Sequence, residues 1–135
     1  MRAPAVLPLL AAAALAGCGQ SSSATQFEGA ERDVAQVVED LQRNAERRNA
    51  EDICARVLAE SLQDKVGRGS TCVEEMGKAV EDADTFQLEV EDVTITGATA
   101  TARVRGTNQA DGVVRTFRLA REGGDWRISS FGAPG

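Results

Sequence analysis

Hydrophobic side chains after residue 26 recur at first at three- and four-residue spacings. Between residues 27 and 48 these positions fall on one stripe of a helix, with polar side chains around it. Acidic residues lie near the start of this segment and arginines near its end, as the helix dipole favours. We therefore predict one long amphipathic helix over residues 27–48, with its apolar stripe formed by Phe27, Ala30, Val34, Val37, Val38, Leu41 and Ala45.

Two shorter helices are predicted to follow. Asn49 can cap a helix that pauses near Glu60 and ends at Gly67. Thr71 and Glu74 then have the spacing of a capping box, in which each side chain accepts a hydrogen bond from a free backbone N–H at the start of the helix. This third helix is expected to end near residue 84, with Val73, Met76, Val80 and Ala83 as its apolar positions.

The hydrophobic period changes from 3.6 to 2 after residue 85, which indicates β-strands. Apolar residues up to Val90 alternate with polar ones, but Val93 and Ile95 continue in the opposite phase. A one-residue slip would place one of these two sets on the wrong face of a sheet. We predict a β-bulge near residues 91–92, which restores a single apolar face and also bends the strand.

Three further strands are expected over residues 98–106, 113–121 and 126–131, in the manner of an antiparallel meander. Together the elements predict an α+β fold, in which one long and two short N-terminal helices pack on a curved four-stranded antiparallel sheet. The inner faces of the last three strands offer these apolar positions: Ala98, Ala100, Ala102, Val104, Phe117, Leu119, Trp126 and Ile128.

Residues 1–17 have the parts of a secretory signal: a positively charged start, an apolar run and small residues at the end. The run is too short to cross a bilayer, which takes about 20 residues. Residues 15–18, Leu-Ala-Gly-Cys, resemble the lipobox of bacterial lipoproteins. In that family the cysteine receives a diacylglycerol and the leader is cut before it. The resemblance implies a mature chain that begins at lipidated Cys18 and is anchored on the extracytoplasmic side of the cell membrane; the alternative is a secreted protein without lipid.

Residues 18–26 are polar and serine-rich, and we predict a flexible tether between the lipid and a domain over residues 27–132. The whole chain has a net charge of −6. Residues 18–96 contain 8 basic and 18 acidic side chains, whereas residues 97–135 contain 6 arginines and 3 acidic side chains. We interpret the opposite signs as attraction within one domain; the functional alternative is a basic face turned toward anionic lipid or cell-wall polymer.

Cys54 and Cys72 remain when Cys18 carries the lipid. Outside the cytoplasm an even pair of cysteines is most simply a disulfide, which here would join the second and third helices. A redox role lacks a Cys-x-x-Cys pair, and a metal site would need carboxylate ligands because the chain contains no histidine. We therefore expect no metal and no cofactor.

The predicted order of elements resembles the nuclear transport factor 2-like superfamily, which has a cystatin-like cone fold. The last hairpin is similar too: an apolar strand, a glycine-rich turn, and Trp126 two residues before Ile128. Cys54 and Cys72 also resemble the helix-two cysteines of actinobacterial lipoproteins in this superfamily. The resemblance covers residues 27–132 and implies a cone-shaped domain, whose helices and curved sheet can enclose a hollow.

The superfamily includes isomerases, dehydratases and polyketide cyclases beside transport factors and binding domains. Its enzymes usually place an Asp, a His or a Tyr in the hollow. No such motif can be carried over to this chain, which contains neither His nor Tyr. A carboxylate with a raised pKa could still act as a base, and Asp84 and Glu89 are the candidates.

Our leading hypothesis is a non-catalytic binding or accessory module, held at the membrane by its lipid, that binds an apolar small molecule, an envelope component or a partner protein. The alternative is a lipid-tethered enzyme of the isomerase or dehydratase type with a carboxylate base, and a third reading is a folded spacer. The acidic charge and the few aromatic residues argue against nucleic acid as a partner.

A small apolar cavity is the expected binding site. Ala98, Ala100, Ala102 and Val104 form a row of mostly small side chains, which we call the alanine row. Small side chains on a curved sheet leave space unless a helix comes close, so we predict a cavity between this row and the long helix. The alternative is close packing, in which alanines allow the helix to approach.

Overall fold

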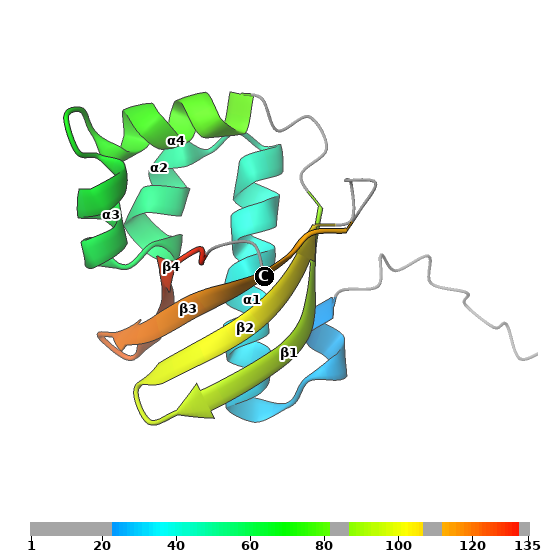
Figure 1. Ribbon diagram of the computed structural model, residues 1–135. Helices are drawn as coiled ribbons and strands as arrows, with labels where there is room; N and C mark the ends of the chain where they lie inside the picture. The colour runs from blue at the N-terminus through cyan, green and yellow to red at the C-terminus, as the bar shows by residue number, and fades with distance from the viewer. Residues whose placement is uncertain (1–22, 82–86, 107–111, 133–135) are drawn as a thin grey trace, which may run out of the picture.

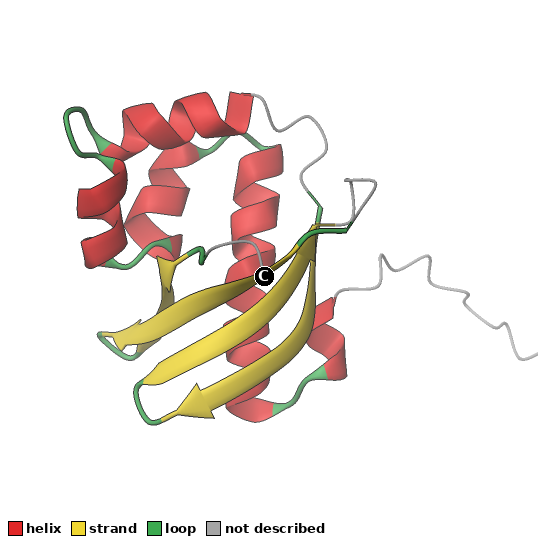
Figure 2. Cartoon of the chain, in the orientation of Figure 1, coloured by secondary structure: helices red, strands yellow, loops and turns green. Residues whose placement is uncertain are grey.

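The computed structural model describes residues 23–81, 87–106 and 112–132, so the predicted leader and Cys18 lie outside the described residues. The helices lie on one side of a curved antiparallel sheet that does not close (Figures 1 and 2), which confirms the predicted α+β class. The elements are the 3-10 helix η1 (Ser23–Gln26), α1 (Gly29–Glu46), α2 (Ala50–Asp52), the π-helix η2 (Ile53–Val57), α3 (Glu60–Val66), α4 (Cys72–Glu81), β1 (Leu88–Thr96), β2 (Thr99–Gly106), β3 (Val114–Glu122) and β4 (Asp125–Ser130).

The sheet is a meander with the strand order β1-β2-β3-β4, and each strand is antiparallel to its neighbours. The pairing of β1 with β2 shifts register between Val90 and Asp92, which confirms the predicted bulge. Because of this shift, Val90 and Val93 are both buried on the inner face although they are three residues apart.

Helix α1 covers the inner face of the sheet (Figure 1) and packs against β1, β2 and β4. Its buried side chains include Val34, Val38, Leu41 and Ala45, so most of the predicted apolar stripe is confirmed. Ala30 is exposed instead, since it lies in the first turn of the helix.

The segment η1 corrects the predicted tether, because its four residues are part of the folded domain. Ala24 is 3% exposed, and its backbone N–H donates to Glu39 at 2.8 Å. The backbone N–H of Val90 donates to the Ser23 hydroxyl at 3.2 Å, and the Gln26 amide donates to the Val90 carbonyl at 2.7 Å. β1 is an edge strand, and η1 therefore supplies hydrogen-bond partners for the edge at its bulge.

Between α1 and α3 the chain departs from ordinary helical geometry. Asn49 caps α2 as predicted, since its side-chain oxygen accepts the Asp52 N–H at 3.2 Å. The five residues of η2 form a π-helix, which ends where the Leu58 N–H donates to the Ile53 carbonyl at 3.0 Å. The chain then extends, and the next N–H, that of Ala59, donates to the carbonyl of Ile128 in β4 at 2.8 Å. The predicted pause in the second helix is thus a hydrogen-bonded junction with the sheet.

Helix α4 begins with the predicted capping box. The Glu74 N–H donates to the Thr71 hydroxyl at 3.1 Å, and the Glu74 carboxylate accepts hydrogen bonds from Ser70 and from Thr71. Met76 and Val80 are buried as predicted, whereas Val73 is 41% exposed. The predicted end of this helix and Ala83 lie outside the described residues.

The predicted disulfide is confirmed. The Sγ atoms of Cys54 and Cys72 are bonded at 2.09 Å, and the two Cα atoms are 6.1 Å apart. The bridge joins η2 to the first residue of α4 and closes a loop that contains α3. It therefore connects the two helices that the sequence analysis expected it to connect.

Candidate functional site

Most of the predicted lining residues meet on the inner face of the sheet. Seven of the eight belong to one buried apolar cluster, which they share with α1 and with η2. Ala98 is the exception, because it lies exposed in the turn between β1 and β2, where its carbonyl accepts the Arg121 N–H at 2.9 Å. The seven buried residues are Ala100, Ala102 and Val104 of β2, Phe117 and Leu119 of β3, and Trp126 and Ile128 of β4.

The alanine row itself is tightly packed. Ala102, in the middle of β2, has no exposed area at all, and its neighbours on the same face, Ala100 and Val104, are almost as deeply buried. A cavity wide enough for a water molecule would leave accessible surface on the side chains that line it. At Ala102 the structure therefore favours the close-packing alternative over the predicted cavity.

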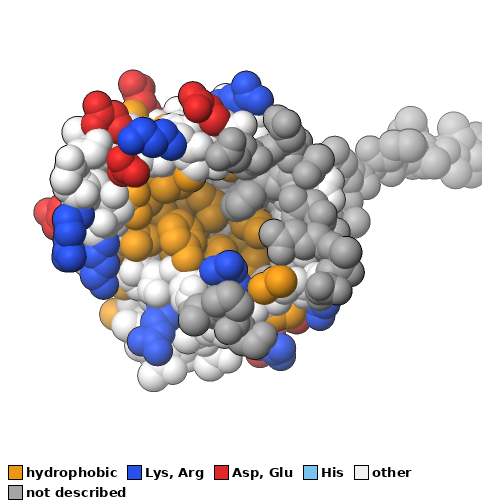
Figure 3. Space-filling model, turned by 45° about the horizontal axis from the view of Figure 1, so that its top comes forward, with side chains coloured by type: hydrophobic (Ala, Val, Ile, Leu, Met, Phe, Trp, Pro, Cys, Tyr) orange, Lys and Arg blue, Asp and Glu red, His pale blue; other side chains and the backbone are white. Residues whose placement is uncertain are grey.

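An apolar hollow lies elsewhere on the molecule. Figure 3 shows hydrophobic side chains gathered at the bottom of a depression, between α4 and the part of the sheet formed by β3 and β4, with charged and polar side chains above it, to its left and below it in this view. The architecture explains the depression, because α4 packs on α2, α3 and η2 and so stands away from the sheet (Figure 1). An exposed apolar surface with a polar rim is typical of a binding site.

Trp126 is a buried residue with an unusual polar group. Its side chain is 5% exposed, and among the described residues its ring N–H is the one buried side-chain nitrogen or oxygen without a hydrogen-bond partner. Its cross-strand neighbour Arg121 places its guanidinium carbon 4.8 Å from the centre of the ring. This cation–π contact covers the aromatic face but leaves the ring N–H unsatisfied.

The structure does not bring the candidate catalytic carboxylates into the hollow. Glu89 is exposed and pairs across the strands with Arg105 on the outer face of the sheet. Asp84 lies outside the described residues. On the exposed side of α4, the hydrogen bond from Ser70 lowers the pKa of Glu74, which favours its charged form.

The arginines of the outer sheet face are partly matched by acids on the neighbouring strand. Arg105 of β2 forms an ion pair with Glu91, which is the bulged residue of β1, at 2.5 Å. Arg103 lies opposite Asp92 in the same pair of strands. This arrangement supports the interpretation of the charge asymmetry as attraction within one domain.

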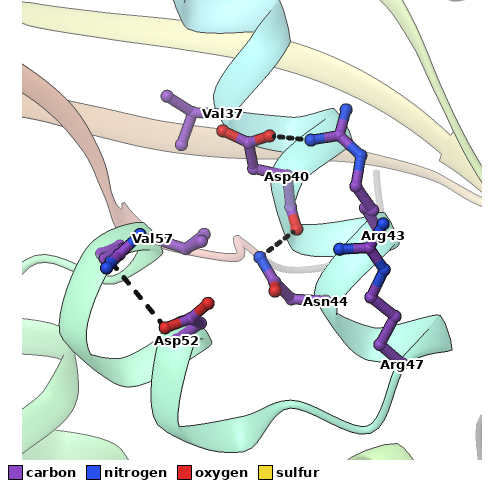
Figure 4. A pocket seen from close by; sticks show the side chains of 8 residues that line it. Val37, Asp40, Arg43, Asn44, Arg47, Asp52 and Val57 are labelled. Atoms are coloured by element: carbon purple, nitrogen blue, oxygen red, sulfur yellow. Dashed lines mark hydrogen bonds and ion pairs between the residues drawn. The ribbon is translucent and has the colours of Figure 1, made fainter.

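A polar cleft separates the C-terminal half of α1 from α2 and η2 (Figure 4). Its volume is about 230 Å³. Arg43 forms an ion pair with Asp40 at 2.7 Å, and the Asn44 amide donates to the Asp40 carbonyl at 2.9 Å. The lining residues are Val37, Asp40, Arg43, Asn44, Arg47, Asp52, Arg56 and Val57.

The sequence analysis did not identify this cleft. The arginines at the end of the long helix were assigned to a favourable interaction with the helix dipole, and Arg56 was not singled out. The available signal was the spacing of acids and arginines three and four residues apart, which brings them together on one helical face. What the spacing could not give is the approach of η2 to α1, which forms the second wall.

A second cavity of about 280 Å³ lies at the junction of α3 and α4, next to the disulfide, and is lined by Gln63, Asp64, Gly67, Ser70, Thr71 and Cys72. Within the described ranges, no three or more Cys, Asp or Glu side chains lie close enough together to hold a metal ion. In that same part of the chain no helix has the length and apolar character needed to cross a bilayer.

Comparison with known proteins adds no assignment: no protein-family model and no curated protein matches this chain.

Proposed function

We propose that this protein is a lipoprotein, anchored on the extracytoplasmic side of the cell membrane through Cys18, whose domain binds an apolar partner and catalyses no reaction. We further propose that the domain belongs to the nuclear transport factor 2-like superfamily. The order of a long helix, short helices and a bulged meander supports this assignment, as does the glycine-rich turn before Trp126.

The observation that carries the binding function is the apolar hollow between α4 and the β3–β4 part of the sheet (Figure 3). Apolar surface exposed to water is costly, so a hollow of this kind is usually retained because a ligand or a partner protein covers it. The charged rim keeps the unoccupied domain soluble and gives polar contacts to whatever enters.

Binding is favoured over catalysis by the position of the ionisable groups. Glu89 points away from the hollow on the outer sheet face, and the chain has no His or Tyr that could serve as a base or a phenolic donor. The alternative of a lipid-tethered enzyme with a carboxylate base would require another acid, such as Asp84, to enter the hollow.

The docked segment η1 supports a location close to the membrane. Four residues separate Cys18 from Ser23, whose hydroxyl is hydrogen-bonded to β1. Five steps between successive Cα atoms span at most about 18 Å in an extended chain. A lipid on Cys18 therefore holds the edge of β1 within about 18 Å of the bilayer surface. The disulfide between Cys54 and Cys72 also fits an oxidising compartment outside the cytoplasm.

Two experiments test the anchor and the hollow separately. Mass spectrometry of the membrane-extracted protein should find an acylated N-terminal Cys18, and Cys18→Ser should abolish acylation. Survival of the acyl mass in Cys18→Ser would refute the anchor without affecting the hollow.

The hollow is tested with ANS, a dye that fluoresces on apolar surfaces. Wild-type protein should enhance ANS fluorescence, and Met76→Lys should reduce the enhancement, because it introduces a charge on the buried side of α4, the helix that borders the hollow. Val73→Lys, on the exposed side of α4, is the matched control and should leave it unchanged. Circular dichroism verifies that each variant is folded. A folded wild-type protein that does not enhance ANS fluorescence would refute the binding site.

A further inference from the structure

The polar cleft between α1 and η2 is distinct from the apolar hollow and has a different chemistry. Three arginines and two aspartates line it, together with the amide of Asn44 and two valines (Figure 4). The lining comes from two walls: α1 and its last turn carry Arg43 and Arg47, whereas α2 and η2 carry Asp52 and Arg56.

The three arginines are unequally paired. Arg43 is close to Asp40, at 2.7 Å. Arg56 is 3.8 Å from Asp52, and its side chain is 78% exposed, so this pair is loose. Arg47 forms no ion pair or side-chain hydrogen bond with any residue in the described part of the chain, although a guanidinium has five donors. The cleft therefore contains the N–H donors of Arg47, which have no acceptor in the described part of the protein, next to the loosely paired carboxylate of Asp52.

The helix dipole explains part of this arrangement. Cations near the C-terminal end of α1 are favoured, which accounts for Arg43 and Arg47 being tolerated four residues apart despite their like charges. The dipole does not provide acceptors for the Arg47 donors, and it does not explain why Arg56 borders the same space from the other wall. An anion in the cleft would accept hydrogen bonds from Arg47 and would also interact with Arg56.

We propose that this cleft binds a small organic acid that also carries a hydrogen-bond donor, as hydroxy acids and amino acids do. The carboxylate of the ligand lies between Arg47 and Arg56, because arginine binds planar oxyanions through paired N–H groups. The hydroxyl or ammonium group of the ligand donates to Asp52, whose carboxylate is only loosely paired.

The size of the cleft fits this ligand class. A water molecule takes up about 30 Å³ of the liquid, so a cleft of about 230 Å³ has room for a molecule of this kind together with bridging water. The two aspartates disfavour a multiply charged anion, because the lining then has too few unpaired cations to balance it.

The test is an NMR titration of the mature chain in detergent with three probes: alanine, lactate and acetate. The side-chain amide signal of Asn44 reports on the cleft, since this amide lines it. Alanine and lactate should shift the signal at lower concentration than acetate, which has no donor for Asp52. Equal affinities for the three probes, or no shift with any of them, would overturn the proposal.

Variants identify the residues that hold the ligand. Arg47→Gln should weaken alanine binding about tenfold, as expected when one charge-assisted hydrogen bond is lost. Arg56→Gln should have a similar effect. Arg118→Gln, an exposed arginine of β3 outside the cleft, is the matched control and should leave the affinity unchanged. Both cleft variants remove exposed, unpaired or loosely paired side chains, so folding should persist. Unchanged affinity in both would refute the site.

Discussion

The molecule combines two regions that are stabilised in different ways. In the α1–sheet region, one helix of 18 residues packs on four paired strands, and burial is spread over many apolar side chains. In the second region, which we call the stapled region, α2, η2, α3 and α4 have between 3 and 10 residues each. Helices this short are marginal on their own. The stapled region therefore depends on a few specific links: the disulfide, the bond from Ala59 to β4, and contacts with α1.

Both proposed binding sites border the stapled region. The cleft lies between α1 and the α2–η2 segment, and the hollow lies between α4 and the sheet. Ligand-binding segments are commonly drawn from the less stable parts of a fold, because they must adjust to what they bind. We conclude from this contrast that the α1–sheet region supplies the rigid wall of each site, whereas the stapled region supplies the wall that can adjust.

The largest effect is expected where the two regions meet. Ile128 is fully buried in β4, and its carbonyl accepts the Ala59 N–H. Ile128→Ala should lower the free energy of unfolding by about 2–5 kcal/mol, because it leaves a cavity that both regions line. Urea unfolding followed by the fluorescence of Trp126, the single tryptophan, measures this loss. Val73→Ala removes an exposed apolar side chain and should change stability by less than about 0.5 kcal/mol.

Removing the disulfide should separate the regions. In the chain-entropy model, closing a loop of this length is worth about 3 kcal/mol. Cys54→Ala combined with Cys72→Ala should therefore lower stability by roughly that amount. Hydrogen exchange should lose protection first in α3 and α4 and retain it in α1 and β3. Uniform loss of protection across both regions would contradict the comparison.

Overpacking tests how closely α1 approaches the sheet. Ala102 has no exposed area, so Ala102→Leu should cost about 1–3 kcal/mol. Thr101→Leu is the matched control, since Thr101 is exposed on the outer face of the same strand and should tolerate the larger side chain. A nearly neutral Ala102→Leu in the same urea assay would restore the predicted cavity.

The sequence predicted the α1–sheet region well because burial there follows a regular period. The change of phase between Val90 and Val93 was enough to locate the bulge, and alternation identified seven of the eight inner positions. Ala98 was assigned wrongly because the turn from Gly97 extends over it, and a turn residue has no fixed face.

The stapled region was predicted less completely, since tertiary contacts decide it. The cap at Asn49 and the cysteine pair were visible as local signals. The π-helix was not, because it depends on the bond from Ala59 to a strand almost 70 residues away in the sequence. The polar cleft was missed for a similar reason, because its second wall forms only when η2 packs close to α1. Docking of η1 was missed for the same reason: a serine-rich sequence does not reveal that Ser23 will meet the bulge of β1.

The smallest effect concerns the entry to α4, where the stapled region has its charged cap. The hydrogen bond from Ser70, followed by those from Thr71, lowers the pKa of Glu74. A carboxyl group with a lowered pKa stabilises the folded state above its ordinary pKa, and this contribution is lost as the pH falls through the lowered value.

Glu74→Gln should therefore reduce stability slightly at about pH 7, and the difference from wild type should shrink as the pH falls through the lowered pKa of Glu74, below which both side chains are neutral. Because Glu74 is exposed, the change should be clearly smaller than that of Ala102→Leu. Ser70→Ala removes the hydrogen bond that contributes most to the lowered pKa of Glu74, so the pKa measured by NMR should move back toward its ordinary value. Ser61→Ala, which changes an exposed serine of α3, is the control and should leave the pKa of Glu74 unchanged. A stability difference that persists unchanged into acid would show that the carboxylate charge does not support the cap.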